Sequence, residues 1–151
     1  MYSELLKVPF LAYLPGCEHK DVYALIQFPD VLPTVLDALG LESESRCMQG
    51  RSFLDVIRGE REEHRSNIIS GYHEAVDRCI RDKEWSYIKR PEGQPDELYN
   101  LVKDPRETRN LIDDKRDIAK RLSSYYGVYF HRSETPWIVK GLQGKYEVPT
   151  S

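Results

Sequence analysis

The sequence predicts an α/β protein, in which one buried strand and a helix precede an antiparallel sheet and a further helix. The apolar run Val8–Leu14 ends at Pro15-Gly16, and its length and turn-forming end indicate a buried strand. Because both of its faces are apolar, this strand is typical of the interior of a sheet that is covered on two sides. Several short strand patterns after residue 66 predict the antiparallel sheet.

Two helices are predicted after the first strand. Residues 30–39 place their apolar side chains on one face: Val31, Leu32, Val35, Leu36 and Leu39. Asp30 is suited to cap the N-terminus of this helix, and Gly40 follows its last turn. Ser52 is expected to cap a second, short helix over residues 53–57, which Gly59 ends.

The next stretch predicts a sheet followed by a helix. The candidate strands are Asn67–Tyr72, Asp77–Ile80, Trp85–Lys89 and Glu97–Leu101, with a hairpin turn at residues 81–84 and a turn at residues 91–95. Apolar residues at helical spacing predict an amphipathic helix over Lys115–Tyr126. We therefore expect three parts: 1–60 with the strand and first helices, 61–126 with the antiparallel sheet and its helix, and an aromatic-rich tail over 127–151.

Composition excludes several classes of protein. The 151 residues carry a formal net charge of -3, and the basic residues are scattered among acidic ones. We therefore expect no nucleic-acid partner and no membrane-surface helix. No apolar run approaches ~20 residues, and the first ten residues do not have the pattern of a signal peptide.

The cysteines and histidines do not predict a structural metal site or a disulfide framework. Three cysteines, Cys17, Cys47 and Cys79, give an odd count with wide spacing. Cys17 and His19 are neighbours, but no second pair completes four zinc ligands. We expect free thiols and no zinc.

Several segments, in order, resemble the C-terminal third of the sulfatase family, which is part of the alkaline-phosphatase-like superfamily. Residues 2–9 (YSELLKVP) resemble the family's YEE-x-x-RVP entry into a core strand, and residues 30–36 (DVLPTVL) resemble its DLMPTLLDLAG helix. Residues 49–54 (QGRSFL) resemble QGRSLLPLL. Residues 79–88 resemble the AIRTGRWKYI hairpin, and residues 97–111 are similar to ELYDL-x-x-DP-x-E-x-x-NL.

The resemblance spans residues 2 to 122 and implies a fold. The expected architecture is the C-terminal portion of an alkaline-phosphatase-like fold: a small antiparallel sheet with packed helices, plus a remnant strand of the large mixed sheet. It implies as well that the catalytic groups precede the matched region. These are a formylglycine made from Cys or Ser in C/S-x-P/A-x-R and a divalent metal, usually calcium. A sulfate ester requires both a cation and an activated nucleophile, so we expect no cofactor in this chain and no catalysis by the chain alone.

The sequence contains one residue to consider as a nucleophile, Cys47, and two to consider as substrate-binding residues, His73 and Arg78. Cys47 and Arg51 have the C-x-x-x-R spacing of the formylglycine motif, but Gln49 stands where Pro or Ala is required, so we expect no nucleophile there. His73 follows a strand in a segment that resembles one at the rim of the substrate cleft in relatives. A histidine there is suited to hydrogen-bond an anionic ester. His73 and, on the neighbouring strand, Arg78 are therefore the substrate-binding candidates.

Two functions are consistent with these patterns. In the first, the chain is the C-terminal part of a sulfatase, or of a related phosphodiesterase or phosphonate monoester hydrolase, with a small anionic ester as substrate. In the second, the chain is a non-catalytic remnant that binds a partner or itself. An apolar strand removed from its sheet favours pairing with another copy, so the isolated chain is expected to be a homo-oligomer. The natural substrate and the compartment are not determined by the sequence.

Overall fold

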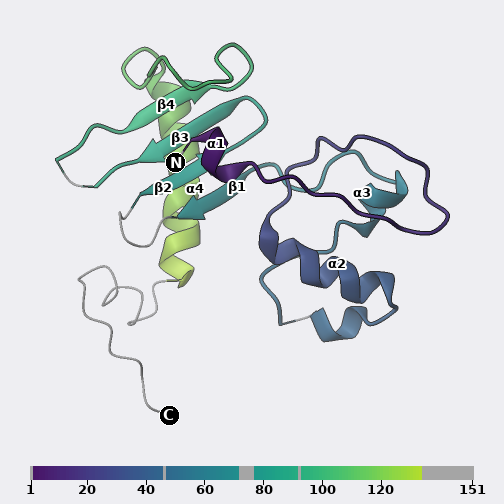
Figure 1. Ribbon diagram of the computed structural model, residues 1–151. Coiled ribbons are helices and arrows are strands. Elements are labelled where there is room, and N and C mark those ends of the chain that lie inside the picture. The colour runs from purple at the N-terminus through teal and green to yellow at the C-terminus, as the bar shows by residue number, and fades with distance from the viewer. Residues whose placement is uncertain (1, 46, 72–76, 92, 134–151) are drawn as a thin grey trace. The chain divides into compact units, whose positions relative to one another are not determined.

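The computed structural model describes residues 2–45, 47–71, 77–91 and 93–133 (Figure 1). The chain forms two compact units. The first combines Met1–Val8 with Ile69–Ser151, and the second is Pro9–Ile68. The first few residues of the chain therefore pack with its C-terminal part.

The first unit is built on an antiparallel sheet. Strands β1 (Ile68–Gly71), β2 (Arg78–Arg81), β3 (Trp85–Lys89) and β4 (Glu97–Asn100) lie in the order β1-β2-β3-β4. In the register, Ile80 lies opposite Tyr87, and Tyr87 lies opposite Leu98. The predicted hairpin is present, because Asp82 Oδ1 accepts the backbone N–H groups of Glu84 and Trp85 in the turn.

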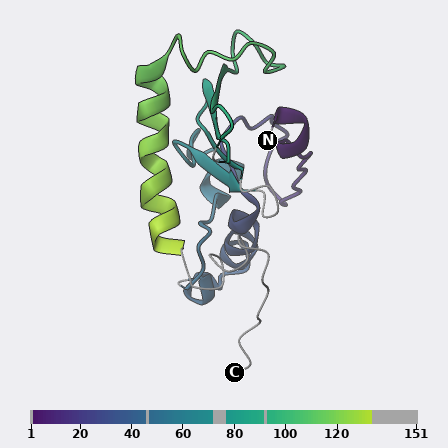
Figure 2. The same cartoon turned by 90° about the vertical axis from the view of Figure 1, so that its left-hand side faces the viewer.

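The two faces of this sheet are covered by different helices. Helix α4 (Arg116–Ser133) packs on one face, where Ala119 and Leu122 join a core with Ile80, Trp85, Tyr87 and Leu98. Helix α1 (Ser3–Leu6) lies on the other face, where Leu6 packs against Cys79, Ile88 and Tyr99. Figure 2 shows α4 and α1 on opposite sides of the sheet. This division follows from the alternation of side chains along a strand.

The outer edge of β4 is closed by the chain that follows it. The backbone N–H of Leu111 donates to the carbonyl oxygen of Leu98 at 2.8 Å, and Asn110 Oδ1 accepts the N–H of Leu98 at 2.9 Å. The residues that close this edge belong to the predicted DP-x-E-x-x-NL pattern. An edge covered in this way is protected from pairing with other chains.

The second unit is mostly helical and loop structure. It contains the 3₁₀ turn η1 (Phe28–Asp30), helix α2 (Val31–Ala38), the 3₁₀ turn η2 (Glu42–Ser45) and helix α3 (Leu54–Arg58). Helix α3 begins one residue later than predicted, because Phe53 and not Ser52 occupies the cap position and makes no side-chain capping bond. Ser52 Oγ still accepts the N–H of Leu54 at 3.2 Å, and Gly59 ends the helix at φ 83° as predicted.

Helix α2 presents its apolar face outward. Its predicted apolar residues include Leu32, Val35 and Leu39, which are 54%, 48% and 67% exposed. The buried residues of the helix are Pro33 and Thr34 instead. Asp30 was also expected to cap α2, but its side chain makes no capping hydrogen bond to the helix. It accepts the N–H of Gln27 in the preceding turn and bonds to residues further along the chain.

Two further elements differ from the sequence prediction. The expected strand over residues 8–14 is not formed: this segment is extended but belongs to no strand. A strand requires backbone hydrogen bonds to a neighbour, and among the described residues none joins residues 8–13 to another segment. Helix α4 continues to Ser133, beyond the predicted end at Tyr126. The rest of the predicted tail, 134–151, lies outside the described residues.

In the part of the chain that the structure describes, no helix combines the length and the apolar character needed to cross a bilayer.

Candidate functional site

Of the two predicted substrate-binding residues, Arg78 lies among the described residues and His73 does not. His73 lies outside the described residues, so its role stays a prediction. Arg78, the first residue of β2, is 7% exposed. Its Nη1 donates to the carbonyl oxygen of Asp77 at 3.0 Å, and a Cβ atom at Gly71 would lie 3.3 Å from its Cδ. Arg78 is thus packed along the sheet next to Gly71, and its contact with substrate remains a prediction.

A second arginine, Arg90, follows β3 directly and is occupied by acidic and phenolic partners. It lies 2.7 Å from Asp77 Oδ2 and 2.6 Å from Glu97 Oε1, and it donates to the Tyr2 hydroxyl at 3.1 Å. Burial alone would lower the pKa of Arg90, but its bond to Glu97 and the nearby negative charges raise it. Because two carboxylates neutralise this guanidinium, Arg90 has a structural role and is not a free anion site.

A buried ion pair joins the start of the chain to its C-terminal part. Arg81 Nη2 donates to Glu107 Oε1 at 2.6 Å, and its Nη1 donates to Ser3 Oγ at 2.8 Å. The other oxygen of Glu107 accepts the backbone N–H of Ser3 at 2.5 Å. Burial raises the pKa of Glu107, but the bonds from Ser3 and Arg81 outweigh it and hold this pKa below its ordinary value. These contacts, which we call the Ser3 clamp, hold α1 against the sheet.

In the second unit, Asp30 is the centre of a comparable buried cluster. Its carboxylate is fully buried and bonds the Arg65 guanidinium at Nη2 and at Nε, the latter at 2.7 Å. It also accepts the backbone N–H of Arg51 at 2.9 Å and that of Gln27 at 3.0 Å. Burial raises the pKa of Asp30, but these hydrogen bonds are stronger and lower it to about 2. The carboxylate is therefore ionised and fully used in holding the loop.

The side of α2 that carries Thr34 and Asp37 makes two bonds to the segment before α3. Thr34 Oγ1 donates to the carbonyl oxygen of Asp30 at 2.7 Å and accepts the N–H of Phe53 at 3.0 Å. Ser52 Oγ donates to the carboxylate of Asp37. Residues 30, 34 and 37 lie on one side of a helix, so this polar side is the one that α2 turns to its own chain.

The candidate nucleophile Cys47 does not have the surroundings of one. It is exposed, and Arg51 of the same C-x-x-x-R spacing is held by its backbone bond to Asp30. Gly50 is packed directly against the backbone of Pro29, where a Cβ atom would lie 1.8 Å from the carbonyl oxygen. These contacts support the interpretation that residues 49–52 are a packed structural segment and not a nucleophile motif.

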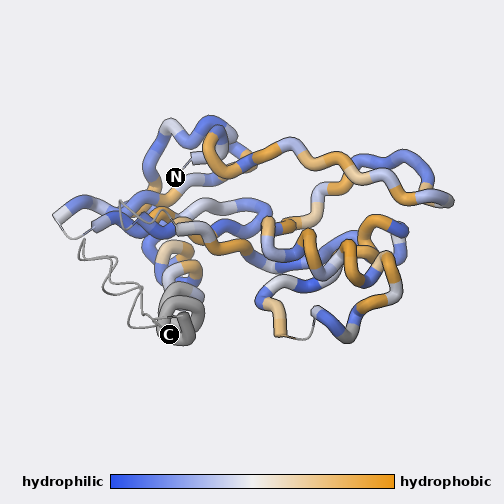
Figure 3. Tube along the Cα trace, turned by 60° about the horizontal axis from the view of Figure 1, so that its bottom comes forward, coloured by the Kyte–Doolittle hydropathy of each residue, from blue (hydrophilic) through white to orange (hydrophobic). Residues whose placement is uncertain are grey.

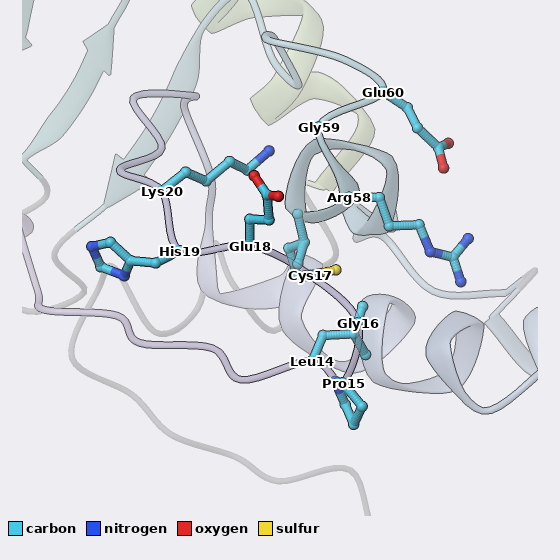
Figure 4. A pocket seen from close by; sticks show the side chains of 11 residues that line it. Leu14, Pro15, Gly16, Cys17, Glu18, His19, Lys20, Arg58, Gly59 and Glu60 are labelled. Carbon is cyan, nitrogen blue, oxygen red and sulfur yellow. The ribbon is translucent and has the colours of Figure 1, made fainter.

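A polar pocket of about 600 Å³ lies in the second unit (Figure 4). It is lined by residues 14–20 on one side and 57–60, at the end of α3, on the other. Lys20 Nζ donates to the carbonyl oxygen of Val56 at 2.5 Å and so ties the loop to α3. Lys20 and Arg58 are balanced by Glu18 and Glu60, so the formal charges of this pocket favour neither an anion nor a cation.

The metal and formylglycine implied by the sulfatase resemblance do not fit the described residues. Among these residues, no group of three or more His, Cys, Asp or Glu side chains could hold a metal ion. The two carboxylates buried in the part of the chain that the structure describes, Asp30 and Glu107, are each paired with an arginine. We therefore assign no chemical step of ester hydrolysis to these residues.

The chain is similar to known sulfatases over both of its units. The family model described as N-sulphoglucosamine sulphohydrolase, C-terminal, matches residues 1–126. The chain is 31% identical over 126 residues to a Delta 4,5-hexuronate-2-O-sulfatase of Bacteroides thetaiotaomicron, and 27% identical over 161 residues to an endo-4-O-sulfatase of the same organism. These matches cover 76% and 90% of this chain.

A solved sulfatase structure from Bacteroides thetaiotaomicron agrees with these sequence matches. It is 27% identical, has a TM-score of 0.62, and covers 70% of this chain. The chain spans only part of each relative: 26% and 32% of the two sulfatases and 24% of the solved structure. With the family model matching most of its length, the chain belongs to the sulfatases, as a member of the family of N-sulphoglucosamine sulphohydrolase C-terminal regions.

Proposed function

We propose that this chain serves as the C-terminal region of a sulfatase that hydrolyses sulfate esters of sugars, and that it contributes no catalytic group of its own. The observation that carries this proposal is the match of residues 1–126 to a sulfatase C-terminal region, combined with the lack of a metal-binding cluster among the described residues. The chemistry of ester cleavage, with its calcium and formylglycine, would then belong to the rest of the enzyme.

The substrate class follows from the relatives. One of the two relatives is named as a Delta 4,5-hexuronate-2-O-sulfatase, and the other is named as an endo-4-O-sulfatase. A sulfated sugar is therefore the proposed substrate, and His73 and Arg78 remain the proposed contacts to it. The sheet that carries Arg78 is covered by helices on both faces, which provides a rigid base for such contacts.

A hybrid enzyme tests this function. In the Delta 4,5-hexuronate-2-O-sulfatase of Bacteroides thetaiotaomicron, the C-terminal region is replaced by this whole chain, and sulfate release from a Δ4,5-hexuronate 2-O-sulfate is measured with calcium. We expect the hybrid to release sulfate and the chain alone to release none. A hybrid that melts cooperatively but releases no sulfate, or a chain that turns over substrate by itself, would contradict the proposal.

Self-association without catalysis is the second candidate function. It is favoured by the large exposed apolar side chains, such as Leu11 and Tyr13, which are 98% and 90% exposed. Light scattering at micromolar concentration tests it: we expect the isolated chain to form dimers or larger species. A strictly monomeric chain would remove this candidate.

A further inference from the structure

Three charged side chains lie together at one end of the sheet in the first unit. Arg90, the residue after β3, lies 2.7 Å from Oδ2 of Asp77, the residue before β2. Two nitrogens of the same guanidinium lie 2.6 and 2.7 Å from Oε1 of Glu97, the first residue of β4. The three side chains are only 13% to 15% exposed. Arg90 therefore joins the ends of three neighbouring strands.

This cluster and the Arg78 side chain belong to opposite faces of the sheet. Side chains alternate between the two faces along a strand. Ile80, two residues after Arg78, packs in the core that α4 covers. Cys79, two residues after Asp77, packs against Leu6 of α1. Asp77 thus lies on the α1 face, and Arg78 begins the α4 face.

Asp77 connects the two faces through its own backbone. Its carboxylate accepts the Nη1 donor of Arg90 at 2.7 Å, and its carbonyl oxygen accepts the Nη1 donor of Arg78 at 3.0 Å. The strand register agrees with this arrangement: Arg78 lies opposite Lys89, so Arg90 comes next to Asp77. Removal of the Arg90 bond would therefore release the residue that holds the Arg78 guanidinium.

Two tyrosines hold Arg90 and Glu97 in place. The hydroxyl groups of Tyr2 and Tyr99 both donate to Glu97 Oε2, at 3.0 and 2.8 Å. The Arg90 guanidinium also lies 5.8 Å from the centre of the Tyr2 ring. Figure 3 shows the loop from β3 to β4, which follows Arg90, as a mostly hydrophilic stretch of tube. Side chains fixed by several partners form a rigid support for a neighbouring binding residue.

We infer that Arg90 is a positioning residue for Arg78, because through Asp77 it sets the orientation in which the Arg78 guanidinium meets a sulfated substrate. This inference rests on the proposed function, in which Arg78 is a substrate contact. A guanidinium binds an oxyanion through N–H donors in a rigid fork, so a small change of its position weakens binding. Arg90 needs no contact with substrate for this role, since two carboxylates already match its charge.

The experiment measures sulfate release by the hybrid sulfatase described above, with a Δ4,5-hexuronate 2-O-sulfate as substrate. We expect Arg90→Gln to raise KM by about ten-fold and to leave kcat within about two-fold, because a binding contact is misplaced. Arg78→Gln should raise KM by about ten- to a hundred-fold. Arg90→Lys keeps the charge without the planar fork, and it should restore part of the loss in KM.

A double variant separates positioning from a general weakening of the fold. In a hybrid that already carries Arg78→Gln, Arg90→Gln should change KM by less than about two-fold, because the residue that it positions is gone. The matched control is Arg116→Gln, which removes an exposed ion pair of the same unit and should leave KM and Tm unchanged. Additive effects of the two substitutions on KM would overturn the positioning role.

For a hybrid that Arg90→Gln unfolds, Asp77→Ala is the second variant. It removes the link to Arg78 but leaves Arg90 paired with Glu97. We expect it to fold and to reproduce the rise in KM. A folded Asp77→Ala hybrid with the KM of the unchanged hybrid would overturn the positioning role.

Binding measured without turnover keeps this inference separate from the proposed function. Calorimetry with calcium omitted gives the Kd of the hybrid for the same substrate. A hybrid that releases sulfate with a KM insensitive to Arg90→Gln would retain the function and reject the positioning role. A hybrid that releases no sulfate, but binds substrate and loses about ten-fold in affinity on Arg90→Gln, would reject the function and retain the positioning role. A folded hybrid that neither binds nor cleaves substrate would reject both.

Discussion

Gly50 and Pro29 are in direct backbone contact, so close that a Cβ atom at position 50 would lie 1.8 Å from the Pro29 carbonyl oxygen and 2.9 Å from the next backbone nitrogen. This contact brings residues 49–52 against the start of α2, where the Arg51 N–H reaches the buried carboxylate of Asp30. The DVLPTVL pattern (residues 30–36) and the QGRSFL pattern (residues 49–54) are thus in direct contact, although they are about 20 residues apart in the sequence.

Substitution of Gly50 should therefore be severe. Gly50→Ala places a methyl group on rigid backbone, and we expect a loss of about 3 kcal/mol or more in the free energy of unfolding. The control is Gly71→Ala, where the nearest atoms belong to the flexible side chain of Arg78 at 3.3 Å. Its effect should stay within about 1 kcal/mol. Urea denaturation measures both, and equal effects would show that the Pro29 contact does not constrain the loop.

Acid should weaken the second unit through Asp30. Its folded-state pKa is lowered from 3.8 to about 2, so the ionised carboxylate contributes stability that is complete above pH about 4 and is lost as the pH falls toward 2. Asp30→Asn should remove this pH dependence. At neutral pH it should cost about 3–5 kcal/mol, because Arg65 keeps a charge without its partner.

The control for Asp30 is an exposed ion pair. Asp113 pairs with Arg116 at 3.1 Å on the surface, with side chains 83% and 80% exposed. Asp113→Asn should change stability by less than about 1 kcal/mol. If Asp30→Asn has a comparably small effect, the cluster does not hold the loop.

His64 should add a second phase of pH dependence at higher pH. Burial lowers the pKa of His64 below 6.5, against the raising effect of the Asp30 carboxylate 3.3 Å away. Below pH about 6.5 the unfolded chain binds a proton there that the folded chain resists, so stability should fall as the pH drops. Melting curves between pH 7.5 and 5 should show this slope in the parent chain and a shallower one in His64→Gln. Identical slopes would mean that His64 takes up its proton freely in the folded chain.

The Ser3 clamp should be essential for attachment of α1. Glu107→Gln preserves the shape of the side chain but leaves Arg81 buried with no carboxylate, and we expect a loss of about 3–5 kcal/mol. Residues 3–6 should then exchange their amide hydrogens faster. Glu4→Gln, on the exposed side of α1, should do neither. Slow exchange at residues 3–6 in Glu107→Gln would show that Leu6 and Tyr2 alone anchor the helix.

Local patterns predicted most of the elements. Strand β3 has the predicted bounds, Trp85–Lys89, because its alternation and the Asp82 turn are both encoded within a few residues. The orientation of α2 was not predictable in this way. Its apolar residues were recognised, but the side that its own chain buries is decided by bonds from Asp30 and Thr34 to residues about 20 positions away.

Contacts between distant parts of the chain account for what the sequence missed. The Ser3–Glu107 bond joins residues 104 positions apart, and no periodicity indicates it. The strand predicted over residues 8–14 has the right side-chain alternation but lacks strand neighbours among the described residues, because strand formation depends on a partner and not on the segment alone. Both substrate-binding candidates remain predictions: Arg78 lies in β2 with no test of a substrate contact, and His73 lies outside the described residues.

Calcium-dependent sulfate release by the hybrid sulfatase that carries this chain tests the central claim most directly. The assay compares the hybrid, the isolated chain and the relative without its C-terminal region, with a Δ4,5-hexuronate 2-O-sulfate as substrate. We predict sulfate release by the hybrid and none by the isolated chain. A hybrid that folds cooperatively but releases no sulfate would contradict the assignment of this chain as a working sulfatase C-terminal region.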